Sequence, residues 1–160
     1  MTVNNLHYCS SSCTSDSQIV QELPKAVGGM WSMPAYWNNT VYFWGQSDVL
    51  KQFSLTSGLL SASPVTTSVN SSSEFGSTPS ISSNGATAGI VWAVYQSASQ
   101  SMVLFAFDAT NVANKLYDST QAANNRDGGG SWVKFTVPTI ANGKVYVGTQ
   151  TELDVYGLLP

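Results

Sequence analysis

Short runs of alternating apolar and polar residues recur along the chain, separated by turn signals. Three apolar runs carry an aromatic side chain and follow an Asn-Asn or Asn-Gly pair, at residues 41–44 (VYFW), 90–92 (IVW) and 145–147 (VYV). After a polar turn, each is followed by a second run, at residues 49–53, 102–107 and 153–156. Asn-Gly is the strongest short hairpin signal because both residues tolerate positive φ. The pattern therefore predicts consecutive antiparallel hairpins.

The same order of features occurs three times, in residues 31–60, 76–117 and 135–160. Each copy opens with a Ser/Thr-x-Pro motif, beginning at Ser32, Ser77 and Thr136. Self-similarity at a period of roughly 40–50 residues is typical of β-propeller blades. Residues 18–23, 64–69 and 113–118 are apolar-polar runs that we expect to open each copy as an outer fourth strand.

The sequence therefore predicts an all-β fold, a β-propeller unit of three four-stranded antiparallel blades. We expect the blades at about residues 18–60, 61–108 and 109–160, after a mobile N-terminal segment over residues 1–17.

Parts of the repeat resemble the repeat of pyrroloquinoline-quinone-like (quinoprotein dehydrogenase-like) β-propellers. The residues that carry the resemblance are 145–149 (VYVGT), 105–110 (FAFDAT) and 53–58 (FSLTSG). The resemblance covers nearly everything from residue 18 onward, and implies the C-terminal blades of a larger bacterial propeller. Quinoprotein dehydrogenases of that type have eight blades and a pair of adjacent cysteines, which this chain lacks. The resemblance therefore implies the fold without quinone binding, and we predict no cofactor.

Three blades cannot close a propeller, which needs about four to eight. Alone they would leave two apolar faces exposed, which soluble proteins avoid. Two chains related by a two-fold axis give six blades, so we predict a homodimer that closes a six-bladed ring. The alternative is a fragment of a seven- or eight-bladed parent.

Charged residues make up only 9% of the chain and its net charge is −3, which argues against a nucleic-acid partner. No apolar run reaches the ~18 residues that cross a bilayer, so no membrane partner is expected. Residues 1–27 lack the basic start and apolar block of a signal peptide. We predict a soluble chain without a signal peptide, whose relatives are exported to the periplasm or secreted.

Metal and nucleophile chemistry has few candidates. The single histidine, His7, stands near Cys9 and Cys13, and zinc prefers four ligands with a supporting shell, so we predict no metal site. The two cysteines could form a local disulfide or remain free thiols. No G-x-S-x-G elbow and no phosphate-binding glycine loop is present.

Two kinds of site remain. Asp48 and Glu152 occupy equivalent turns, so in a ring they could frame one opening as the paired carboxylates of a glycoside-type hydrolase, or simply be turn residues. A carbohydrate or other small molecule could instead contact aromatic and loop residues, namely Trp44, Trp92, Arg126, Asp127 and Trp132. Because no nucleophile and base come together, the sequence favours a non-catalytic binding and assembly module. A hydrolase is the alternative, and whether the protein is an enzyme stays open.

Overall fold

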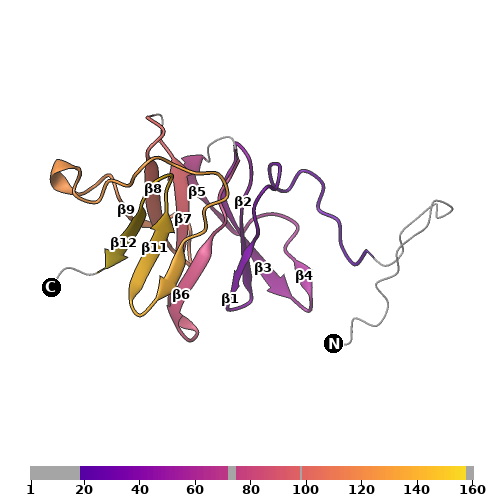
Figure 1. The fold of residues 1–160 in the computed structure, drawn as a ribbon. Helices are drawn as coiled ribbons and strands as arrows, with labels where there is room; N and C mark the ends of the chain where they lie inside the picture. Colours follow the sequence, from indigo (N-terminus) through magenta and orange to yellow (C-terminus); the bar gives the residue numbers. More distant parts are fainter. Residues whose placement is uncertain (1–18, 72–74, 98, 158–160) are drawn as a thin grey trace.

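The computed structural model describes residues 19–71, 75–97 and 99–157, which form three antiparallel β-sheets (Figure 1). Within these ranges the only helical element is the single 3-10 turn η1 (Ala123–Asn125). The predicted all-β fold class is therefore confirmed. No helix in the described part of the chain is long and apolar enough to span a membrane.

The sheets follow one another along the chain. The first contains β1 (Ala35–Trp37), β2 (Thr40–Trp44), β3 (Val49–Thr56) and β4 (Leu59–Leu60) in order, with β5 (Thr66–Ser71) also paired to β3. The second runs β6 (Ser80–Asn84), β7 (Thr87–Gln96), β8 (Met102–Asp108) and β9 (Lys115–Asp118). The third consists of β10 (Thr139–Ala141), β11 (Lys144–Gly148) and β12 (Leu153–Gly157). The turn residues Asn39, Gly85 and Gly143 have positive φ, as their hairpins require.

The predicted order of the outer strands is wrong. β5 and β9 pair with β3 and β8, the preceding long strands, so residues 64–69 and 113–118 close one sheet instead of opening the next. Residues 19–23 form no strand, and residue 18 lies outside the described ranges. Because consecutive strands joined by a short connection usually lie next to each other, the chain pairs again with the strand at the edge of the sheet that it has just formed. The sheets consequently have five, four and three strands, so only the second has the predicted four.

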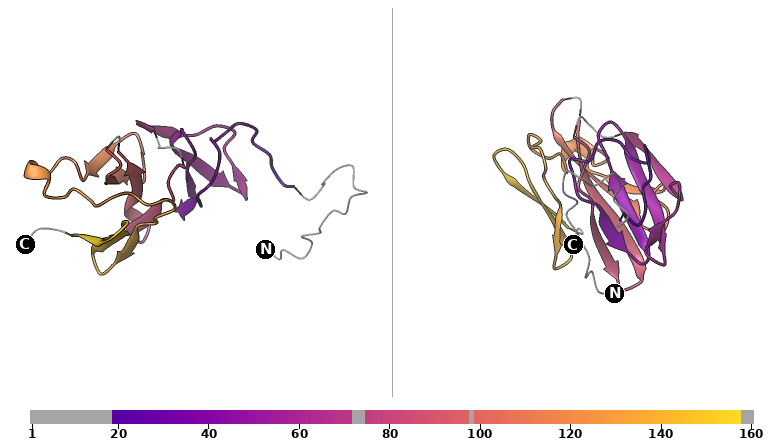
Figure 2. Two further views of the ribbon diagram at one scale, coloured as in Figure 1. Left: turned by 45° about the horizontal axis from the view of Figure 1, so that its top comes forward. Right: turned by 90° about the vertical axis from the view of Figure 1, so that its right-hand side faces the viewer.

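The second sheet lies between the other two and buries both of its faces (Figure 2). On one face Val91, Ala93, Phe105 and Phe107 pack against Tyr42, Trp44 and Leu50 of the first sheet. On the other face Val94, Met102 and Leu104 pack against Val145 and Val147 of the third sheet. Strand alternation produces this division, and β8 is buried continuously from Met102 to Phe107 because it contributes to both cores.

The two outward faces of the stack differ. Residues 19–29 cross the outward face of the first sheet, where Lys51 Nζ donates to the Ala26 carbonyl at 2.9 Å. Phe53 on this face is only 1% exposed. On the third sheet, Leu153 and Val155 are 64% and 51% exposed. One end of the stack is therefore covered by residues 19–29, whereas no described segment crosses the other end.

Candidate functional site

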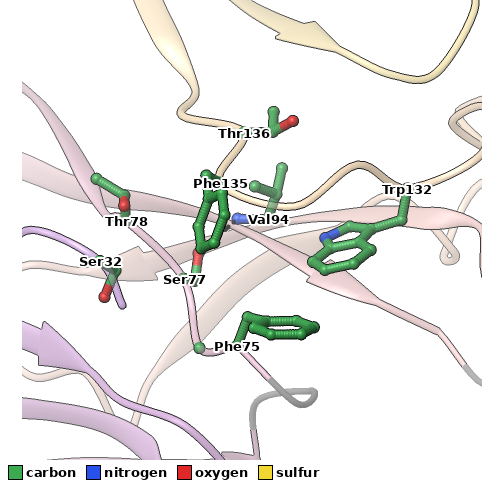
Figure 3. A pocket seen from close by; sticks show the side chains of 9 residues that line it. Ser32, Phe75, Ser77, Thr78, Val94, Trp132, Phe135 and Thr136 are labelled. Atoms are coloured by element: carbon green, nitrogen blue, oxygen red, sulfur yellow. Dashed lines mark hydrogen bonds between the residues drawn. The ribbon is translucent and has the colours of Figure 1, made fainter. Parts of the chain in front are cut away.

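The three Ser/Thr-x-Pro motifs meet at one hollow. β6 contacts both β1 and β10, so the segments that enter these three first strands converge. They surround a small hollow, with room for no more than about one water molecule, lined by Ser32, Phe75, Gly76, Ser77, Thr78, Val94, Trp132, Phe135 and Thr136 (Figure 3). Each of the three sequence repeats therefore contributes residues to the same site.

Hydrogen bonds of the motif residues hold the entry segments in place. The carbonyl of Trp44 accepts from Ser32 Oγ at 3.2 Å and from the Ser77 backbone N–H at 3.1 Å. The Met33 N–H donates to Thr78 Oγ1 at 3.4 Å, which joins the first two segments. Thr136 Oγ1 donates to the Gly148 carbonyl at 3.1 Å. Short hydroxyl side chains thus fix the walls of the hollow to the strands behind them.

An aromatic cluster borders the hollow, with Phe75 at its centre. Trp132 stacks on Phe75 with ring centroids 6.1 Å apart and an interplanar angle of 18°. Phe135 and Trp31 meet Phe75 edge-on at 6.1 and 6.3 Å. Lys134 Nζ lies 4.1 Å from the Phe75 ring centroid, in a cation–π contact. We call these four aromatic residues and the lining residues together the aromatic hollow.

Two rings of the cluster remain open to solvent. Trp31 is 58% exposed and Phe135 is 57% exposed. Phe135 also has a φ of +66°, in the left-handed region that bulky side chains rarely adopt. Such a conformation costs of order 1–3 kcal/mol and is typical of ligand-binding segments held by their surroundings. The backbone thus keeps an apolar ring in water at a conformational cost.

The aromatic hollow has the chemistry of a neutral binding surface. Its flat rings offer apolar contact, and each lining hydroxyl retains hydrogen-bonding capacity beyond the single bond it makes here. No carboxylate, histidine or cysteine is among the residues that line it. The exposed rings and hydroxyls around the hollow can therefore contact a ligand with both apolar faces and hydroxyl groups, and the residues that line the hollow supply no acid–base pair for hydrolysis.

Of the three tryptophans predicted to contact a ligand, only Trp132 lies at the hollow. Trp44 is fully buried between the first and second sheets, and its indole N–H donates to the Asp48 carbonyl at 2.8 Å. Trp92 packs against the core between the second and third sheets, and its indole N–H donates to Ser82 Oγ at 2.8 Å. Both rings are in the packing between sheets.

Arg126 and Asp127 do not line the hollow; they anchor the loop between β9 and β10. Arg126 donates twice to the Asp127 carboxylate, at 2.7 and 2.9 Å. Tyr117 of β9 donates to the same carboxylate at 2.7 Å, and Tyr156 of β12 donates to the Asp127 carbonyl at 3.2 Å. The hydrogen bonds from Arg126 and Tyr117 lower the pKa of Asp127 to about 2. Asp127 therefore ties the second sheet to the third.

The two predicted carboxylates have separate surroundings. Burial acts to raise the pKa of Asp48, but its ion pair with Lys51 at 2.7 Å and the backbone N–H groups of Gly28 and Val49 outweigh burial and lower it. The Glu152 carbonyl accepts from Thr149 in the β11–β12 turn. Asp48 lies in the β2–β3 turn of the first sheet and Glu152 in the β11–β12 turn of the third, and their pairing stays a prediction.

Metal-binding side chains do not gather in threes anywhere in the described ranges. His7, Cys9 and Cys13 lie outside those ranges.

Comparison with known proteins adds no relative. No family model, no curated protein and no solved structure matches the chain. The candidate site is therefore argued from the geometry of this chain alone.

Sequence reasoning missed Phe75 and Phe135 at this site. The signal was present, because an aromatic residue stands one or two positions before each Ser/Thr-x-Pro motif: Trp31, Phe75 and Phe135.

Proposed function

We propose that the protein is a non-catalytic β-propeller module of the pyrroloquinoline-quinone-like repeat type, which binds a carbohydrate or similar small molecule against the exposed rings around the aromatic hollow. The observation that carries the proposal is the convergence of the aromatic residues that precede all three repeat motifs. Three consecutive meander sheets whose first strands lie side by side are what a sector of a propeller requires. In such a sector the hollow lies near the axis, where propellers commonly bind ligands.

A carbohydrate suits the hollow better than a charged ligand. Sugar rings present C–H faces that pack on indole and phenyl rings, and their hydroxyls match the serine and threonine side chains around the rings. None of the described residues that line the hollow is charged, and Lys134 beside it already lies over Phe75. A neutral polyol therefore loses less hydration on binding here than an anion or a cation would.

Tryptophan fluorescence measures this binding directly, because Trp132 and Trp31 belong to the cluster. We expect a neutral oligosaccharide from a panel to give a saturable change, and Trp132→Ala and Phe135→Ala to weaken it at least tenfold. Tyr36→Ala is the matched control, since Tyr36 is 59% exposed and lies outside the hollow. A panel without any saturable response, or equal weakening by Tyr36→Ala, would refute the proposal.

Ring closure forms the second part of the proposal. Two copies in a two-fold arrangement supply six blades, with the open face of one third sheet meeting the first sheet and residues 19–29 of the other copy. Light scattering after size exclusion is expected to give twice the chain mass of 17.0 kDa. A stable monomer at all concentrations would contradict ring closure. It would not bear on the proposed binding of a ligand at the aromatic hollow.

The hydrolase alternative depends on Asp48 and Glu152. It predicts that Asp48→Asn and Glu152→Gln abolish turnover of a glycoside without unfolding the protein. The binding module predicts no turnover by the unaltered chain.

A further inference from the structure

Trp31 and Gln46 form a second aromatic position beside the central space of the aromatic hollow. The ring centroid of Trp31 lies 6.3 Å from that of Phe75, but neither Trp31 nor Gln46 is among the residues that line this space. Trp31 directly precedes the first Ser/Thr-x-Pro motif, and Gln46 belongs to the turn between β2 and β3. Both are therefore contributed by the first repeat, whereas Phe135 is contributed by the third.

Two contacts hold the Trp31 ring in one orientation although Trp31 is 58% exposed. Phe75 meets the ring edge-on, and the indole N–H donates to Gln46 Oε1 at 3.3 Å. The Gln46 N–H in turn donates to the Gly29 carbonyl at 2.7 Å, and a Cβ atom at Gly29 would lie 2.9 Å from Gln46 Oε1. Glycine therefore leaves the room that this amide occupies. A ring that is fixed before binding loses less conformational freedom when a ligand stacks on it.

The side-chain amide of Gln46 places hydrogen-bond donors beside this ring. An indole N–H is only a donor, so the amide oxygen is the atom that faces Trp31 and the amide nitrogen is left for another partner. No residue in the described ranges accepts a hydrogen bond from this nitrogen. An exposed aromatic face with amide donors next to it suits a sugar ring, whose C–H face packs on the indole while its hydroxyls accept from the amide.

We propose that Trp31 and Gln46 hold a second unit of the ligand, which makes the ligand a chain of sugar units instead of a single sugar; this inference rests on the proposed function. The central space has room for about one water molecule, so the ligand lies across the exposed rings instead of entering it. Trp31 and Phe135 are exposed to nearly the same extent, and each meets Phe75 edge-on. Because a sugar ring is about the size of an aromatic ring, contact with both exposed rings requires more than one unit.

A chain-length series of the neutral sugar that binds best tests the second position by titration calorimetry. We expect the longer saccharides to bind the unaltered chain about tenfold more tightly than the shortest one that binds. Trp31→Ala should remove this gain and leave binding of the shortest saccharide unchanged, whereas Phe135→Ala should weaken both. Tyr36→Ala is the matched control, because Tyr36 is 59% exposed and lies outside the hollow.

The dependence on chain length separates this inference from the proposed function. Equal affinity for all lengths, or equal weakening of short and long saccharides by Trp31→Ala, overturns the second position while the proposed function stands. A series in which no saccharide binds overturns both.

Gln46→Glu tests the amide donors. A carboxylate still accepts from the Trp31 indole N–H, but the amide N–H groups are lost, so we expect weaker binding of the longer saccharides alone. Gln121→Glu is the matched control, because Gln121 Oε1 also accepts a hydrogen bond at 3.3 Å, from the Asp118 N–H. Unchanged binding of the longer saccharides by Gln46→Glu contradicts the proposed contact with Gln46.

Acrylamide quenching of tryptophan fluorescence checks that Trp31 is accessible in the full chain. Trp31 is the most exposed of the five tryptophans, so Trp31→Phe should remove most of the emission that acrylamide quenches. Unchanged quenching would mean that another part of the chain covers Trp31, and the proposal would then be wrong.

Discussion

Replacing Gly89 with alanine probes the contact between the first two sheets. A Cβ atom at Gly89 in β7 would lie 2.7–2.8 Å from three carbons of the Trp37 ring. Trp37 has little room to move, because it is 9% exposed and its indole N–H donates to the Gly85 carbonyl at 2.8 Å. Overpacking of this kind costs about 1–3 kcal/mol. Alanine regains up to about 1 kcal/mol of backbone entropy over glycine. We expect a net destabilisation of about 1–2 kcal/mol.

Urea unfolding followed by tryptophan fluorescence measures this change. With a slope of about 1–3 kcal/mol per molar urea, the midpoint should fall by roughly 1 M. Gly148→Ala is the matched control, because a Cβ atom there meets nothing within 4 Å, and it should be neutral or slightly stabilising. The clash involves the outer ring of the indole, which phenylalanine lacks. In a Trp37→Phe background Gly89→Ala should therefore cost almost nothing. An equal cost in both backgrounds would refute the reasoning.

Three further changes have defined outcomes. Phe135→Gly should stabilise the fold by about 1 kcal/mol in thermal unfolding, because glycine accepts a φ of +66° freely. The same change should weaken ligand binding in a fluorescence titration. Tyr42→Phe should cost about 1–2 kcal/mol in urea unfolding, because it leaves the Ala109 carbonyl without its 2.6 Å hydrogen bond. Burial raises the pKa of Tyr42 and of Tyr156 to about 12, so stability should be full below pH 10 and fall as the pH rises toward 12. For buried Tyr42 the loss is of order 2–3 kcal/mol, and Tyr42→Phe should flatten that part of the pH profile.

Local signals in the sequence predicted the hairpins well. The Asn-Asn and Asn-Gly turns and the apolar runs act within a few residues, and they placed β2, β7 and β11 where the structure has them. The alternation of a strand also puts Tyr42 and Trp44 on one face of the sheet and Phe43 on the other. These features depend on φ preferences and on the period of a strand, both of which are properties of a short segment.

Pairing partners could not be predicted in the same way. The run at residues 18–23 has the composition of a strand, yet residues 19–23 lie against the first sheet without joining it. The side-chain amide of Gln21 makes the two hydrogen bonds to the Leu60 backbone that a paired strand would make, at 2.8 and 2.9 Å. The amino-acid composition of a segment does not show whether its side chains or its backbone groups make the hydrogen bonds to a neighbouring strand. Whether β5 closes one sheet or opens the next is likewise decided by distant residues.

The candidate site could be predicted only in part. Trp132 was predicted as a ligand-contacting residue and lies at the hollow, whereas Trp44 belongs to the core because it is buried between the first sheet and the second. Phe75 stands in a connection without strand periodicity, so no alternation pattern marks it. Its role depends on Trp132, which is 57 positions later in the chain and is brought close only when the sheets stack.

The burial of the second sheet on both faces has a consequence for how the molecule fluctuates. The first and third sheets each pack on the second, so either can open locally while the rest remains folded. Amide hydrogens of β8 should exchange slowest with solvent, and those of β12 fastest among the long strands. A ligand bound against the rings of the aromatic hollow would touch the entry segments of all three sheets and would slow exchange in the outer two sheets together. Ligand binding would then couple the local opening of the three sheets, so that they unfold as one cooperative unit.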